Sequence, residues 1–159
     1  MAVGVLCNRV VDGLQIESKY KTTLAEIAKR DGAYKGVPDE VRAMDVDGYE
    51  RRNGGDAQRT MDAAVGIADD VNGVNGRLML VELKLNQKNY RNLIGSQMEL
   101  REKEAHTRDI LRELSTIEKN AVFVVPEKHL QVLKSAFGKV YRSAIVCSPT
   151  TFKEVVTLT

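Results

Sequence analysis

Apolar residues alternate with small or polar residues most clearly between positions 60 and 85, and this period of two predicts two neighbouring β-strands. In the first segment, apolar side chains recur at every second position from Met61 to Ile67. In the second segment, which runs from residue 77 to residue 85, one face carries Met79, Val81 and Leu83, and the other carries Leu78, Leu80, Glu82 and Lys84. Two Asn-Gly steps separate the segments and tolerate the positive φ angles of a tight reversal, so an antiparallel hairpin is expected.

The register of this hairpin decides which side chains meet. If the two strands pair symmetrically about Gly73, Asp62 lies opposite Lys84 and Ala64 lies opposite Glu82. Because the side chains of a strand alternate between its faces, the three charged groups would then project from the same side of the sheet.

Weaker patterns predict the other elements. Thr23-Leu-Ala-Glu26 has the form of a capping box and predicts the start of a helix, which Gly32 would end. Further strands are expected at 2–11, 41–49, 121–125 and 140–147, and further helices after Asn86 and at 129–137, the last ended by Gly138. This order predicts one α/β domain over residues 1–159, with a mixed central sheet flanked by helices.

Composition places the chain among ordinary globular proteins. Its 159 residues are 43% hydrophobic and 29% charged, which excludes disordered, collagenous and membrane-spanning classes. No apolar run approaches the roughly 20 residues that cross a bilayer, and the first residues lack the basic region of a secretory signal. With Cys7 and Cys147 far apart and expected to be reduced and buried, a cytoplasmic protein without membrane contact is predicted.

The net charge of +2 does not by itself predict a nucleic-acid partner, so the local clustering of basic residues matters more. Arg51, Arg52 and Arg59 precede Asp62, and a second basic group consists of Lys84, Lys88 and Arg91. Both groups would flank one site. Arg59, Lys88 and Arg91 are therefore candidate nucleic-acid contacts, although basic side chains are also common on solvated surfaces.

Asp62, Glu82 and Lys84 are the candidate catalytic residues. Glu82 and Lys84 stand two apart on one strand, so their side chains share a face about 7 Å apart. Two carboxylates that reach one ion form the hard oxygen site that Mg²⁺ (or Mn²⁺) prefers. Asp62 and Glu82 would bind the metal, and Lys84 would orient water and offset transition-state charge. The small residues Ala64 and Gly66 would leave room for a phosphate.

Asp62 and the run Val81-Glu82-Leu83-Lys84 resemble the PD-(D/E)XK nuclease superfamily, and the resemblance extends from about Thr60 to Arg101. It implies a restriction-endonuclease-like α-β-β-β-α-β core and Mg²⁺-dependent hydrolysis of nucleic acid, with DNA favoured over RNA. By position alone it implies Gln97 as a further catalytic residue and Glu26 as a first-helix carboxylate. A homodimer or a partner subunit is expected. The sequence departs from the family at Met61, which stands where the pattern has proline.

Two other interpretations stay open. A non-catalytic binding or immunity-type module on the same fold would use Glu82 and Lys84 as a structural ion pair, and a small-molecule enzyme would need a deep apolar pocket. Asp69 and Asp70 are expected to be turn residues. His106 and His129 lack a second ligand at helical spacing and are expected at the surface.

Overall fold

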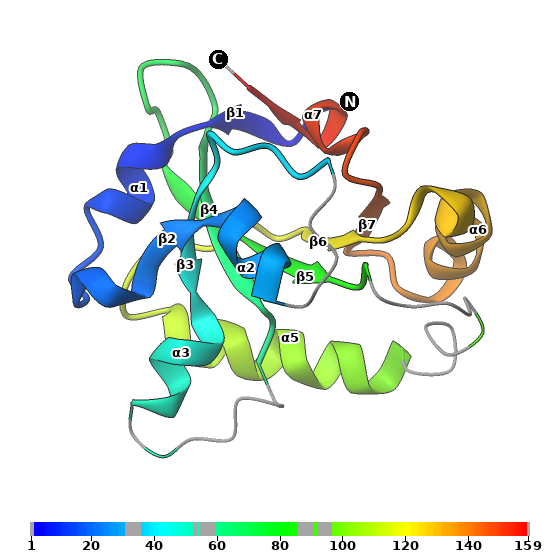
Figure 1. Cartoon of the computed structure of the whole chain (residues 1–159), viewed down its shortest axis with the longest axis horizontal. Helices are drawn as coiled ribbons and strands as arrows, with labels where there is room; N and C mark the ends of the chain where they lie inside the picture. The colour runs from blue at the N-terminus through cyan, green and yellow to red at the C-terminus, as the bar shows by residue number, and fades with distance from the viewer. Residues whose placement is uncertain are drawn as a thin grey trace.

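The computed structural model describes residues 2–30, 36–52, 54, 60–85, 91 and 97–158, which form a mixed eight-stranded β-sheet flanked by helices (Figure 1). In sheet order its main path is β2 (Lys21–Thr23), β3 (Arg42–Asp45), β4 (Ala63–Ala68), β5 (Arg77–Leu83), β6 (Ala121–Val124) and β7 (Ala144–Cys147). Neighbours are antiparallel from β2 to β5 and parallel from β5 to β7. Beside this path, β1 (Gly4–Leu6) pairs with β4 and with β8 (Val156–Thr157). The predicted α/β fold with a mixed sheet is confirmed.

Helices cover both faces of the sheet. One apolar core includes residues of α1 (Asn8–Asp12), α3 (Val46–Arg51), α5 (Gln97–Leu111) and α6 (Leu130–Val140). The other includes residues of α2 (Leu24–Arg30) and α7 (Phe152–Val155), and α2 lies in front of the sheet in Figure 1. Short 3₁₀ turns occupy Ser18–Tyr20 and Glu127–His129. No helix in these described ranges is long and apolar enough to cross a membrane.

The two faces of β5 belong to different cores, as the alternating pattern predicts. Leu78 and Leu80 pack in the core beneath α5, whereas Met79, Val81 and Leu83 pack in the core beneath α2. Glu82 has the parity of Leu78 and Leu80. Its side chain therefore lies on the α5 side of the sheet.

The predicted hairpin exists, but its predicted register is wrong by two residues. Ala64 pairs with Leu80 rather than with Glu82, and Gly66 pairs with Leu78. The reversal is centred earlier than Gly73 because the Asp69 N–H donates to the Val74 carbonyl at 2.7 Å, with positive φ angles at Gly73 and Asn75. A shift of two residues preserves the faces of both strands. Continuing the pairing brings Asp62 beside Glu82 instead of Lys84.

Several predicted boundaries also need correction. The predicted first strand is only β1, because the chain turns into α1 after Cys7. The strand expected at 41–49 ends at Asp45, whose side chain accepts from the Gly48 N–H at 3.1 Å and caps α3. Gly138 lies inside α6 and does not end it, and the last predicted strand begins at Ala144. The capping box is supported by the Glu26 N–H, which donates to Thr23 Oγ1 at 3.1 Å, whereas Gly32 lies outside the described residues.

Gly66 permits a close approach of two chain segments, and this contact overturns the expectation that Gly66 leaves room for a phosphate. A Cβ atom at Gly66 would lie 2.2 Å from the Cys7 carbonyl oxygen and 2.8 Å from Val10 Cβ. The Cys7 N–H donates to the Gly66 carbonyl at 2.9 Å. The space beside β4 is therefore filled by the β1–α1 junction, and Ala64 is likewise fully buried.

We expect Gly66→Ala to lower the free energy of unfolding by about 1–3 kcal/mol or more, because the added methyl group collides with backbone. Gly138→Ala is the matched control. Its Cβ would meet no atom within 4 Å, and alanine is the better helix former by about 0.5–1 kcal/mol. Urea denaturation of both variants checks the pair, and equal stabilities would contradict the packing at Gly66.

Candidate functional site

Asp62 and Glu82 hold each other through the backbone where β4 begins and β5 ends. The Asp62 N–H donates to Glu82 Oε1 at 3.1 Å, and the Leu83 N–H donates to Asp62 Oδ2 at 2.8 Å. Each carboxylate thus binds the backbone of the other strand. This reciprocal pair sets the two acidic groups side by side on the face of the sheet that α5 covers.

Two lysines neutralise Glu82, which is only 1% exposed. Lys84 Nζ lies 3.6 Å from Glu82 Oε2, and Lys103 Nζ from α5 lies 3.3 Å from the same oxygen. Lys84 confirms the same-face geometry expected of Glu82-x-Lys84. Lys103 was missed, because it is one of many charged residues in a helix with no sequence relation to residue 82.

Thr107 holds the residues that lead into β4 against α5. Its side chain is fully buried, its Oγ1 accepts from the Met61 N–H at 2.9 Å, and its hydroxyl donates to the Lys103 carbonyl at 2.7 Å. On the other side, the Val46 N–H donates to the Asp62 carbonyl at 3.3 Å. Asp62 is therefore positioned by β5, α3 and α5 together.

The site is acidic, and burial makes its charges costly. Burial, together with the negative charge of Glu82, raises the pKa of Asp62 well above its ordinary value. Burial also raises the pKa of Asp47 to about 6, even though the Thr60 hydroxyl donates to its carboxylate. Burial is the largest single influence and would lower the pKa of Lys103, but the hydrogen bond to Glu82 and the negative charges of Glu82, Asp62 and Glu99 together leave the pKa raised. Lys103 is thus held as a cation.

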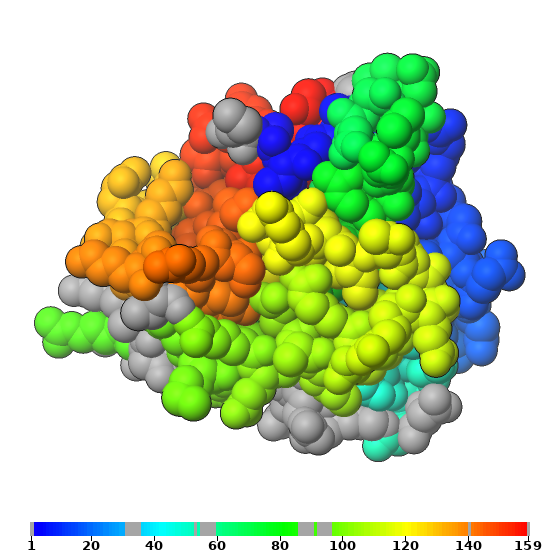
Figure 2. All heavy atoms as spheres, turned by 180° about the vertical axis from the view of Figure 1, so that it is seen from behind, coloured from blue at the N-terminus to red at the C-terminus, as the bar shows by residue number. Residues whose placement is uncertain are grey.

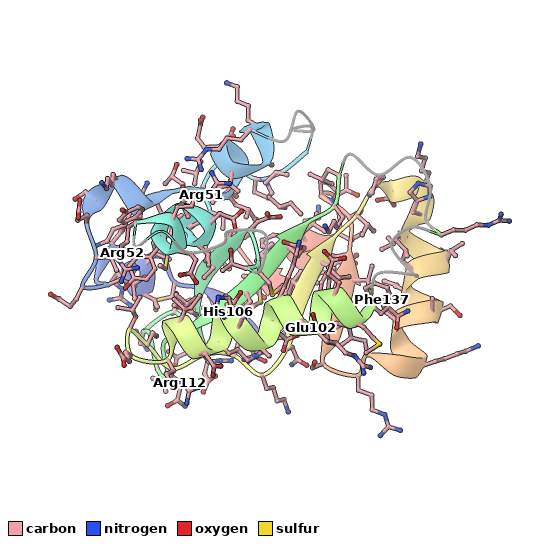
Figure 3. The ribbon with its side chains drawn as sticks, turned by 90° about the horizontal axis from the view of Figure 1, so that it is seen from below. Arg51, Arg52, Glu102, His106, Arg112 and Phe137 are labelled. Atoms are coloured by element: carbon pink, nitrogen blue, oxygen red, sulfur yellow. The ribbon has the colours of Figure 1, made fainter. Side chains whose placement is uncertain are left out.

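α3 borders the site with further polar contacts. On the side of α5 nearer α3 (Figure 3), His106 Nε2 lies 2.9 Å from Glu50 Oε2 of α3. The exposed Arg51 is the last residue of α3, and the exposed Arg52 follows it directly. The structure therefore places basic side chains of the predicted cluster on an element that contacts the site.

The other predicted residues have varied outcomes. Gln97 is partly exposed at the first position of α5, Arg91 is exposed, and Arg59 and Lys88 lie outside the described residues. Glu26 is exposed on α2, which packs on the opposite face of the sheet. This placement favours its capping role.

Asp69 and Asp70 lie in the turn as predicted, whereas His129 and one cysteine differ from expectation. Asp70 accepts from the Asn72 N–H at 3.0 Å, and Asp69 binds Asn75 and Arg77, as expected for turn residues. His129 is 8% exposed, so its expected surface position is wrong. Both cysteines are free, but only Cys147 is buried, whereas Cys7 is partly exposed.

The donor set is suited to a hard divalent cation. Asp62 and Glu82 present oxygen ligands, and Asp47 adds a third negative group whose charge acts on both of them. Burial, and after it the negative charge of Glu82, raises the pKa of Asp62, and a nearby cation would favour the ionised form. Over the described ranges, no three acidic, histidine or cysteine side chains already converge on one point suitable for a metal. The protein would therefore supply Asp62 and Glu82, with water completing the shell.

Comparisons of the chain with protein-family models, curated proteins and solved structures found no match. Function is therefore inferred from the geometry and chemistry of this site.

Asp62→Asn should stabilise the metal-free protein as the pH rises. In the unfolded chain Asp62 ionises near its ordinary pKa, whereas in the folded protein it ionises only at a higher pH, so unfolding releases a proton between these values and stability falls. Asparagine removes this penalty and can still accept from Leu83. Melting temperatures near pH 5 and near pH 8, in the presence of a chelator, should differ most between variant and wild type at the higher pH.

Asp69→Asn is the control, because hydrogen bonds from Asn75 and Arg77 lower the pKa of Asp69 and its charged form is favoured in the fold. Its substitution should give no gain at high pH. A lower melting temperature for Asp62→Asn than for wild type near pH 8 would contradict the electrostatic description.

Thr107→Val should cost about 1–3 kcal/mol, because it leaves the Met61 N–H buried without its acceptor while preserving side-chain shape. Thr107→Ser retains the hydroxyl and should retain the slow exchange of the Met61 amide hydrogen. Hydrogen exchange measured by NMR checks both variants. Equal exchange of this amide in wild type and Thr107→Val would exclude the positioning role.

Proposed function

We propose that the protein is a divalent-metal-dependent nuclease that hydrolyses phosphodiester bonds in nucleic acid, with DNA favoured over RNA. The observation that carries this proposal is the interlocked pair of Asp62 and Glu82, with the ammonium groups of Lys84 and Lys103 both within 4 Å of Glu82. Buried acidic groups with perturbed pKa values beside cations are typical of catalytic sites.

The order of elements supports the restriction-endonuclease-like core that the sequence resemblance implies. α2 is followed by β3, the short helix α3, the strands β4 and β5, then α5, and then β6 parallel to β5, with β3, β4 and β5 antiparallel to their neighbours in this group. With α3 as an insertion between β3 and β4, the order is compatible with α-β-β-β-α-β. Asp62 precedes the middle antiparallel strand, and Glu82-x-Lys84 lies at the end of the next, which is compatible with the pattern that the resemblance implies.

Asp62 and Glu82 would hold Mg²⁺ or Mn²⁺. Such an ion supplies positive charge beside the scissile phosphate and makes water a better nucleophile. The chain itself supplies the rest. Lys84 and Lys103 place positive charge where the phosphate gains negative charge in the transition state. Because its pKa is raised, Lys103 acts as a fixed cation, which leaves Lys84 to orient the attacking water.

Rigid placement favours catalysis at this site. Backbone N–H groups orient both carboxylates, and the backbone of a paired strand is more rigid than a side chain. Thr107 also ties the start of β4 to α5. A site that is already ordered avoids reorganisation during the reaction. Arg51 and Arg52 would contact the phosphate backbone of the substrate at the α3 border.

A non-catalytic binding module is the second candidate, and one observation favours it. Glu82 accepts hydrogen bonds or ion pairs at both oxygens, and Asp62 accepts from Leu83. Such contacts also describe a closed structural network. Metal binding distinguishes the candidates, because a structural network has no use for a divalent ion.

Glu82→Gln should lower metal-dependent cleavage at least about a hundredfold, because it removes a metal-binding charge while preserving side-chain size. Cleavage of plasmid DNA, single-stranded DNA and RNA is measured with Mg²⁺ or Mn²⁺. Lys84→Ala and Lys103→Ala are tested beside it and should reduce the rate of cleavage more than the affinity for metal. Manganese binding is measured by calorimetry on the same proteins.

Glu118→Gln is the matched control. Glu118 is 7% exposed and is paired with Arg77 at 3.0 Å, at the opposite end of β5 from Glu82. This variant also removes the charge of a buried, ion-paired carboxylate, but at a position away from the site. The proposal fails if no substrate is cut and no metal binds, or if Glu118→Gln lowers cleavage as much as Glu82→Gln.

A further inference from the structure

A surface hollow lies against α5, outside the carboxylate site. Its volume is about 550 Å³, and the residues that line it include Arg101, Glu104, Arg108, Tyr141, Arg142 and Ser143. Successive helical residues turn by about 100°, so Arg101, Glu104 and Arg108 project from a different face of α5 than Lys103 and Thr107. Figure 2 shows this side of the molecule, where α5 (yellow-green) adjoins the segment leading into β7 (orange). We refer to it as the arginine pocket.

Among the described residues that line the arginine pocket, Glu104 is the only carboxylate, and both of its oxygens accept hydrogen bonds. Glu104 Oε2 accepts from Arg108 Nε at 2.8 Å, and Glu104 Oε1 accepts from the Tyr141 hydroxyl. Arg108 also donates to the carbonyls of Glu118 and Lys119 at 2.9 and 3.0 Å. Arg108 and Glu104 therefore form a fixed, nearly neutral wall.

Arg101 and Arg142 remain as uncompensated positive charges. In the part of the chain that the structure describes, neither has a carboxylate within ion-pair distance. Both side chains are exposed, so each is available to a ligand. Two guanidinium groups beside a neutralised carboxylate give the pocket a net positive charge.

Aromatic packing makes this wall rigid. Tyr141 is only 4% exposed. The centre of its ring lies 5.5 Å from the centre of the Phe123 ring and 6.2 Å from the centre of the Phe137 ring. The guanidinium carbon of Arg101 lies 5.1 Å from the centre of the Tyr141 ring. This cation–π contact orients Arg101 while leaving its N–H donors available.

We propose that the arginine pocket binds a phosphate group belonging to a ligand of about nucleotide size. Guanidinium groups match phosphate oxygens through paired, charge-assisted hydrogen bonds. The volume lies within the range of small-molecule sites and exceeds the space that one phosphate needs. A free nucleotide and a nucleotide unit of a nucleic-acid strand both supply this chemistry. The site needs neither a metal nor Asp62 and Glu82, so it is independent of the proposed function.

The test measures binding without cleavage. Inorganic phosphate, 5′-AMP and a short fluorescent thymidine oligonucleotide are titrated into the full chain in chelator, at fixed low salt. The double variant Arg101→Gln/Arg142→Gln should lower the affinity for whichever of these three probes the wild type binds at least about tenfold, because two charge-assisted contacts are lost. Arg142→Gln alone should give a smaller loss. Circular dichroism confirms that the variants are folded.

Arg112→Gln is the charge-matched control, because Arg112 lies next to α5, is exposed and is ion-paired with Asp109. It should change affinity by less than about twofold. Loss of 5′-AMP or phosphate binding in the double variant identifies a free anion as the source, whereas loss of oligonucleotide binding alone identifies a strand. Absence of saturable binding by all three probes, or an equal loss in Arg112→Gln, overturns the proposal.

Discussion

The exchange of hydrogen bonds between Asp62 and Glu82 is the constraint on which the candidate site depends. Each carboxylate accepts an N–H from the strand that carries the other, so the acidic pair exists only in the observed register of β4 and β5. A one-residue slip of either strand would turn the carboxylate of that strand to the opposite face of the sheet and separate the pair. Sheet pairing and site geometry are consequently the same structural feature.

The burial of these acidic groups lowers the stability of the fold. Asp62 lies beside the buried Glu82, and burial together with the negative charge of Glu82 raises the pKa of Asp62. Lys84 and Lys103 compensate Glu82, and Thr107 supplies a buried acceptor for the strand that leads into Asp62. A purely structural network gains little from such acidity, because apolar packing would stabilise the same position at lower cost. This cost supports the proposal that Asp62 and Glu82 receive a cation.

α5 connects the separate parts of the molecule. One of its faces carries Lys103 and Thr107 to the carboxylates, and another carries Arg101 and Arg108 to the arginine pocket. Leu100 and Leu111 bury the helix against the sheet. A polar helix can perform these roles at once because residues three or four apart share a face, while intervening residues point elsewhere.

The sequence by itself determined the hairpin strands β4 and β5, their faces and the partnership of Glu82 with Lys84, because side-chain alternation is a local property of β-structure and survives a two-residue error in register. Local hydrogen bonding likewise made the Thr23 capping box and the Asp70 turn predictable. Only the tertiary structure decided that Asp62 lies beside Glu82, that Lys103 and Thr107 join them, and that β1 and α1 fill the space beside Gly66. These contacts link residues up to about sixty positions apart, and no local periodicity encodes which distant side chains the packing of a helix on a sheet will bring together.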